Sequence, residues 1–120
     1  MAQYVDGFVI PVQKRKLKAY LRQAKLGARI WKDHGALAYS ECVAEDLDIP
    51  YGMGFRKLAR LKPGETVVFS FIVFKSRAHR DKVNAAVMKD PRMGGPEMQG
   101  PMPFDMKRFA TGGFEVLVAW

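Results

Sequence analysis

The sequence predicts an α+β domain of ferredoxin-like type, in which two helices cover one face of a four-stranded antiparallel sheet. Three observations predict this fold: a β-rich segment opens the chain, an amphipathic helix pattern follows it, and the most β-prone segment precedes a second, capped helix. Together they give the order βαββαβ, which is the split βαβ pattern. With 120 residues the chain has room for one domain, which we expect to span residues 1–120.

The first half of the pattern is a strand followed by a long helix. Tyr4–Val12 alternates and is rich in β-formers, and we expect this strand to stop at Pro11. Lys14 to about Asp33 has helical spacing, and Gly35 should end the helix because glycine adopts the left-handed cap. The stripe expected to pack inward consists of Leu17, Tyr20, Leu21, Ala24, Ala28 and Trp31.

The second half adds three strands and one helix. Ser76 is a good N-cap for a helix that should run to about Asp90, just before Pro91. In the last strand, Gly112-Gly113 indicates either a bulge or a close backbone approach. The remaining expected elements are strands over Ala36–Ala44, Thr66–Phe74 and Arg108–Ala119, and a short helical turn over Phe55–Leu61 within the irregular connection Glu45–Gly64.

A long loop is predicted between Pro91 and Asp105, with four prolines, three glycines and three methionines. Connections of this length without regular structure are uncommon and are usually functional or disordered. The methionines give the loop apolar, adaptable side chains. Three interpretations stay open: an ordinary surface loop, a lid over a cavity, and an arm that reaches a second subunit.

The strand Thr66–Phe74 is apolar on both faces. Its two sets are Val67, Phe69, Phe71 and Val73 on one face, and Val68, Ile72 and Phe74 on the other, with Ser70 as the polar interruption. An antiparallel sheet with one wet face should instead alternate apolar and polar residues. Because two helices cannot cover both faces of one sheet, we expect a homodimer in which a twofold-related copy covers the second face.

Charge is segregated along the chain, whose net charge is +8. Residues 14–32 hold eight bases and no acid, whereas residues 33–48 hold five acids and no base. A single cysteine, Cys42, excludes an internal disulfide framework, and no apolar run approaches the ~20 residues of a membrane span. The N-terminal residues lack the layout of a secretory signal, so we expect a cytoplasmic protein with no membrane association.

Six co-ordered segments carry a resemblance to a known family: Tyr4–Phe8, Trp31–Leu37, Lys75–Asp81, Met88–Arg92, Met102–Asp105 and Gly112–Glu115. They resemble the YbaA-like family, small uncharacterised bacterial proteins of the dimeric α/β-barrel superfamily. The resemblance spans nearly the whole chain and implies a ferredoxin-like protomer that pairs sheet to sheet as a dimeric α/β barrel. It implies no specific activity, since a fold does not confer function. The chain departs from the family pattern in its more basic first helix and its longer loop.

Two histidines are candidates for chemistry. His79 shares a helical stripe with Val83 and Val87 and should face the sheet, where it could act as a general base. The alternative is a half-buried histidine that hydrogen-bonds near the start of its helix. His34 lies at a helix C-terminus, where we expect it to serve as a structural cap.

Polar residues on the predicted strands are candidates for a binding site. Asp6 and Ser70 interrupt neighbouring strands, so we expect both on the inner face of the barrel, with Asp6 either paired or lining a wet cavity. Asp6 joins His79 as a candidate catalytic residue. The candidate ligand-binding residues are Ser70, Glu41, Phe8 and Phe104, to which Cys42, Thr111 and Glu115 could add polar groups.

No metal or cofactor is expected from the sequence. The His, Asp and Glu residues lack metal-ligand spacing, and no glycine-rich segment fits a dinucleotide fingerprint. Cys42 has no recognisable base beside it, so we interpret it as a small core residue.

Basic residues recur on one face of the first helix, at Lys18, Arg22, Lys25, Arg29 and Lys32. Such a row could attract nucleic acid or anionic metabolites. It lacks interleaved aromatics, and acids from residues 33–48 or from the other subunit could neutralise it. We therefore favour a solvated or intersubunit-paired face over an anion site.

The sequence thus predicts a homodimer that binds a small organic molecule in a cavity between sheet and helices. A cofactor-independent oxygenation or isomerisation in this cavity is a further option. The alternatives are anion or nucleic-acid binding through the basic first helix, and a structural homodimer without a ligand.

Overall fold

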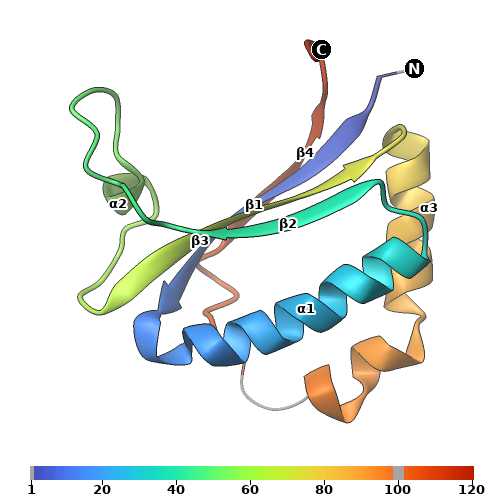
Figure 1. The fold of residues 1–120 in the computed structure, drawn as a ribbon, viewed down its shortest axis with the longest axis horizontal. Helices are drawn as coiled ribbons and strands as arrows, with labels where there is room; N and C mark the ends of the chain where they lie inside the picture. Colours follow the sequence, from blue (N-terminus) through green and yellow to red (C-terminus); the bar gives the residue numbers. More distant parts are fainter. Residues whose placement is uncertain (1, 99–101) are drawn as a thin grey trace.

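The computed structural model describes residues 2–98 and 102–120 and is built around one antiparallel sheet of four strands in the order β2-β3-β1-β4. Figure 1 shows that the long helices α1 and α3 lie on the same face of this sheet. The arrangement confirms the predicted α+β, ferredoxin-like fold. It also leaves the opposite face, the open face, without a long helix.

The two central strands make the longest pairing. β1 (Tyr4–Gln13) pairs with β3 (Glu65–Phe74) over ten residues. The edge strands are shorter: β2 (Ala38–Val43) pairs with β3, and β4 (Ala110–Glu115) pairs with β1. The alternation predicted for β3 is correct, since Ser70 and Ile72 point to the helices while Phe69 and Phe71 point to the open face.

β1 does not stop at Pro11, which corrects the sequence-based expectation. The Lys14 N–H donates to the Gly64 carbonyl on the β3 side, whereas the Gln3 carbonyl accepts from the Val116 N–H on the β4 side. The backbone N–H and C=O groups of the odd-numbered residues of β1 therefore point toward β4. β4 pairs with β1 only as far as Val9. The nitrogen of Pro11 therefore points beyond the end of β4, where its missing N–H costs no ladder bond.

The helices begin and end with the predicted signals. A short 3₁₀ turn, η1 (Lys14–Lys16), leads into α1 (Leu17–Asp33), and Gly35 follows with a left-handed φ of 103°. α3 (Arg77–Met88) starts at Ser76, whose hydroxyl accepts the His79 N–H at 3.1 Å.

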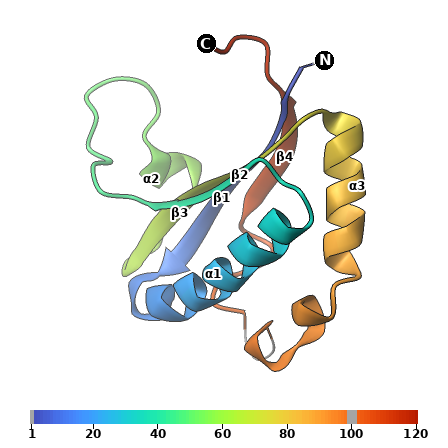
Figure 2. The ribbon, with the colours of Figure 1, turned by 45° about the vertical axis from the view of Figure 1, so that its right-hand side comes forward.

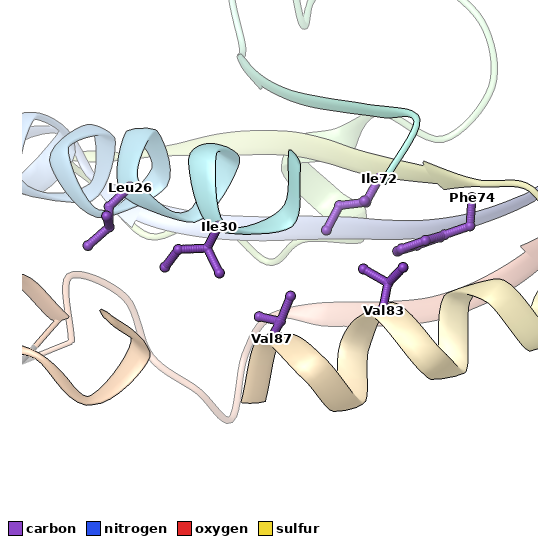
Figure 3. Close-up of a cluster of buried hydrophobic side chains, with 6 residues drawn as sticks. All are labelled: Leu26, Ile30, Ile72, Phe74, Val83 and Val87. Atoms are coloured by element: carbon purple, nitrogen blue, oxygen red, sulfur yellow. The ribbon is translucent and has the colours of Figure 1, made fainter. Parts of the chain in front are cut away.

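The buried side of α1 differs from the predicted stripe. Leu21 is 38% exposed, whereas Leu26 and Ile30, which the stripe omitted, are buried. α1 contacts β2, α3 and the chain after α3. A larger part of its circumference is therefore buried than in a helix that packs on a sheet only. Figure 3 shows Ile72 and Phe74 of β3 pointing toward Val83 and Val87 of α3 beside these two α1 side chains.

Two long connections flank the sheet. The β2–β3 connection (residues 44–64) contains the short helix α2 (Phe55–Leu58) and reaches the open face, where Phe55 contacts Phe69 edge-on at 6.5 Å between ring centroids. The α3–β4 connection (residues 89–109) holds two 3₁₀ turns, η2 (Pro91–Gly94) and η3 (Pro96–Met98). Figure 2 shows these turns on the helix side. Gly100 and Pro101 of the predicted loop lie outside the described residues.

β4 is shorter than predicted and contains no bulge. Gly112 and Gly113 pair with Gly7 and Asp6 in an unbroken register. The glycines instead meet the second expectation, a close approach, because a Cβ on Gly113 would collide with the ring and hydroxyl of Tyr4.

Candidate functional site

A cavity of 770 Å³ lies between the sheet and the helices. All four strands form its floor, α1 and α3 form two walls, and the α3–β4 connection lines the remaining side. Five of its lining residues are methionines: Met88, Met93, Met98, Met102 and Met106. The described residues of the predicted loop Pro91–Asp105 belong to this connection and lie beside the cavity. Of its three interpretations, a lid over a cavity agrees with this position, and the role of a lid stays a prediction.

Three of the predicted ligand-binding residues lie in one row across the sheet that forms the cavity floor. The strand registers align Glu41 with Ser70, Ser70 with Phe8, and Phe8 with Thr111. Phe104 reaches the cavity from the α3–β4 connection and contacts the ring of Tyr20 edge-on, with centroids 5.8 Å apart. The structure thus brings Glu41, Ser70, Phe8 and Phe104 into one cavity, and their binding role stays a prediction.

The shared face of Asp6 and Ser70 is the one covered by the helices, which corrects the expectation that they lie inside a sheet-to-sheet barrel. Successive residues of a strand point to opposite faces. Ser70 is on the helix side, so its neighbours Phe69 and Phe71 occupy the open face. Any barrel interior made by the open faces would therefore contain these aromatic side chains in place of Asp6 and Ser70.

Asp6 is both paired and part of the cavity. Its Oδ1 accepts from Arg80 Nη1 at 3.2 Å and its Oδ2 from Asn84 Nδ2 at 3.1 Å. Asn84 Oδ1 in turn accepts from Trp31 Nε1 at 2.9 Å. The guanidinium of Arg80 also lies 4.9 Å from the ring centroid of Tyr4. This network compensates the charge of a carboxylate that is 6% exposed.

Glu41 is held by two tyrosines. Tyr20 donates its hydroxyl to Oε1 at 2.6 Å, and Tyr39 donates to Oε2 at 2.7 Å. Burial raises the pKa of both phenols, and their hydrogen bonds to Glu41 raise it further. The two hydroxyls therefore stay protonated and act as neutral donors to the carboxylate.

His79 lies outside the cavity lining as the described residues define it. It sits in the first turn of α3 with its ring edge-on to Phe74, at 6.0 Å between centroids. Its Nδ1 accepts the Lys75 N–H at 3.0 Å, which leaves Nε2 near Gly35. The structure does not bring His79 together with Asp6, and the catalytic role of either residue stays a prediction.

Ion pairs tie both ends of the α3–β4 connection to the scaffold. Asp90 accepts three hydrogen bonds from Arg92, and its Oδ2 lies 2.8 Å from His34 Nε2. Hydrogen bonds from Arg92, and then the one to His34, hold the pKa of Asp90 well below its usual range. At the other end, Arg108 pairs with Glu65 at 2.6 and 2.9 Å. His34 thus links the end of α1 to this connection besides capping the helix.

Cys42 is exposed, so the expectation of a core residue is wrong. It follows Glu41 on the edge strand β2 and therefore points away from the helices. Thr111 lines the cavity, whereas Glu115 is exposed at the end of β4.

The basic residues of α1 are all exposed: Lys18, Arg22, Lys25, Arg29 and Lys32. Within residues 2–98 and 102–120, none of the five forms an ion pair. Two of the acids expected to neutralise them are engaged elsewhere, since Asp33 pairs with Arg92 and Asp48 with Arg56.

Sequence reasoning missed Arg80, Asn84 and Tyr39 as cavity residues. Arg80, Asn84 and Met88 recur every four residues along α3, which places them on one side of the helix. Tyr39 is two residues from Glu41 and so shares its face of β2. These spacings can be read from the sequence, but the residues that each side chain contacts on other elements cannot.

The described residues contain no group of three His, Cys, Asp or Glu side chains that could hold a metal ion. No helix among them combines the length and apolar character needed to cross a membrane.

The fold and the cavity define a ferredoxin-like α+β protein with a cavity on the helix side of its sheet. The chain belongs to a family described as a protein of unknown function (DUF1428), whose model matches residues 3–106. It is 41% identical over 116 residues to the uncharacterized protein YbaA of Escherichia coli K12 and to that of Shigella flexneri, covering 97% of each chain. The predicted family resemblance is thereby confirmed.

A solved structure supports the fold independently. It is a dimeric ferredoxin-like protein from an uncultured marine organism, with a TM-score of 0.62 and 12% identity over the full length of both chains. At this identity the likeness concerns the fold alone.

Proposed function

We propose that this protein binds a small organic molecule in the cavity between sheet and helices. The observation that carries the proposal is the 770 Å³ volume together with its lining, in which methionine and phenylalanine side chains surround a few polar groups on the floor. Binding sites for small molecules are typically clefts of about 300–1,000 Å³ with this mixture of apolar walls and convergent polar points.

Filling the cavity tests this proposal. Ala24 lines the cavity from α1, so Ala24→Trp should occupy its space and weaken binding of the neutral dye Nile red at least about tenfold. Dye fluorescence titrations on the folded variant measure the change. Leu21→Trp adds the same ring on the exposed side of α1 and should leave binding unchanged. Equal affinity of Ala24→Trp and the native protein would contradict the proposal.

A cofactor-independent oxygenation or isomerisation in this cavity stays a prediction. Asp6 is the candidate catalytic residue that lines the cavity, and Arg80 and Asn84 fix both of its oxygens. A carboxylate oriented in this way could accept a proton from a bound molecule.

We also propose that the chain forms a homodimer through its open face. Phe114 is 60% exposed there, and Phe69 stays 47% exposed although Phe55 of the β2–β3 connection contacts its ring. The protomer is flat, with extents of 40 × 38 × 21 Å, and its radius of gyration of 15.2 Å exceeds the about 13.6 Å typical of a compact chain of 120 residues. A dimeric solved structure of the same fold supports this proposal.

The second candidate function is binding of a polyanion by the exposed bases of α1. The observation that favours it is the absence of ion pairs at all five bases among the described residues. Replacing the five with glutamine should abolish binding of a fluorescent single-stranded DNA in anisotropy titrations. The native affinity should fall steeply with salt. Native-like binding by the substituted protein would remove this candidate.

The cytoplasmic location expected from the sequence stays a prediction.

A further inference from the structure

Glu41 forms no ion pair with a cationic side chain among the described residues. Its two hydrogen-bond partners, Tyr20 and Tyr39, are neutral donors. The other cavity carboxylate, Asp6, has the guanidinium of Arg80, which is also 2.9 Å from Asp81. A half-buried carboxylate without a cation is unfavourable, and a bound cation would relieve this cost.

Ser70 adds a second, independent observation beside Glu41. The two residues are directly opposite each other in the β2–β3 register. Ser70 is 4% exposed and lines the cavity, yet none of the described residues forms a hydrogen bond with its hydroxyl. Because Ser70 lines the cavity, a hydroxyl without a partner among the described residues can accept from or donate to a molecule bound there.

Aromatic rings surround this polar corner. Trp31 and Tyr39 lie 5.9 Å apart between centroids, and Tyr20 contacts Phe104. The faces of such rings attract ammonium groups, whereas they offer nothing to a carboxylate. Beyond the rings, the methionines of α3 and the α3–β4 connection provide a flexible apolar surface.

We infer that the cavity selects an amphipathic amine, whose ammonium group lies between Glu41 and Ser70 and whose apolar body lies against the methionines. This inference rests on the proposed function and names the class of its ligand. The ammonium donates to free lone pairs of the carboxylate and to the Ser70 oxygen, since each carboxylate oxygen can accept more than the one bond it has. A carboxylate ligand would instead be repelled by Glu41.

Three probes of equal chain length test the inference: octylamine, 1-octanol and octanoate. Each is titrated against the native protein by displacement of Nile red at neutral pH, where the amine is protonated. Octylamine should bind about tenfold or more tightly than 1-octanol, and octanoate should bind most weakly. Glu41→Gln should bring octylamine to within about twofold of 1-octanol. Glu45→Gln removes an equal charge from an exposed position and should keep the native preference.

Ser70→Ala keeps the inference testable if Glu41→Gln does not fold, and should weaken octylamine about threefold or more without changing 1-octanol. Equal binding of octylamine and 1-octanol by the native protein, or a preference for octanoate, would overturn the amine class while leaving the cavity as a binding site. Failure of all three probes and of Nile red to bind would overturn both proposals.

Discussion

Phe114→Asp should convert the protein from a dimer into a monomer at micromolar concentration. Phe114 is 60% exposed on the open face, so its loss removes few contacts within the protomer. In a twofold interface the substitution occurs twice, and each new carboxylate would be buried without a partner. We expect the dissociation constant of the dimer to rise at least about 100-fold, or ~2.7 kcal/mol. Sedimentation velocity over a concentration series measures this change.

A matched control separates the interface from general effects of a new charge. Leu21→Asp places the same carboxylate at a 38% exposed position of α1 and should remain dimeric. Figure 1 shows that α1 lies on the face of the sheet opposite the open face. A native protein that sediments as a folded monomer at these concentrations would contradict the homodimer. So would a Phe114→Asp variant that stays dimeric.

Phe74→Ala should destabilise the fold by about 3–5 kcal/mol. Phe74 is fully buried at the end of β3, in the cluster that joins the sheet to α1 and α3. The alanine leaves a cavity among residues held on three different elements, which cannot all move inward. Since a typical domain has about 5–15 kcal/mol of stability, this loss is a large share. Urea unfolding at one fixed protein concentration measures the difference.

Tyr51→Ala is the control for this prediction. Tyr51 is 79% exposed in the β2–β3 connection, so its loss should change stability by about 0.5 kcal/mol or less. A Phe74→Ala variant that is as stable as the Tyr51→Ala variant would show that the cluster is not where the fold is stabilised.

Much of the fold was predictable because its signals are local. Ser76 caps α3 through a bond to His79, and Gly35 ends α1 with the positive φ that glycine favours. The double apolar pattern of β3 identified a central strand. Pro11 was misinterpreted because its effect depends on the length of β4, which is a property of the partner strand.

The candidate site was predictable only in part, for a similar reason. Asp6 and Ser70 stand out as polar residues within apolar strands, and both line the cavity. Alternation alone cannot say which face the helices cover, so both were assigned to the wrong side of the sheet. Arg80 and Asn84 were missed because their pairing with Asp6 joins residues more than 70 positions apart.

Methionine methyl NMR tests the central claim most directly, namely that a small molecule occupies the helix-side cavity. In the native protein labelled at its methionine methyl groups and titrated with 1-octanol, the five cavity methionines should shift together and saturably. Met53, 64% exposed in the β2–β3 connection, provides an internal reference and should not move. Cavity signals that stay in place, or that move no more than the Met53 signal, would contradict the claim.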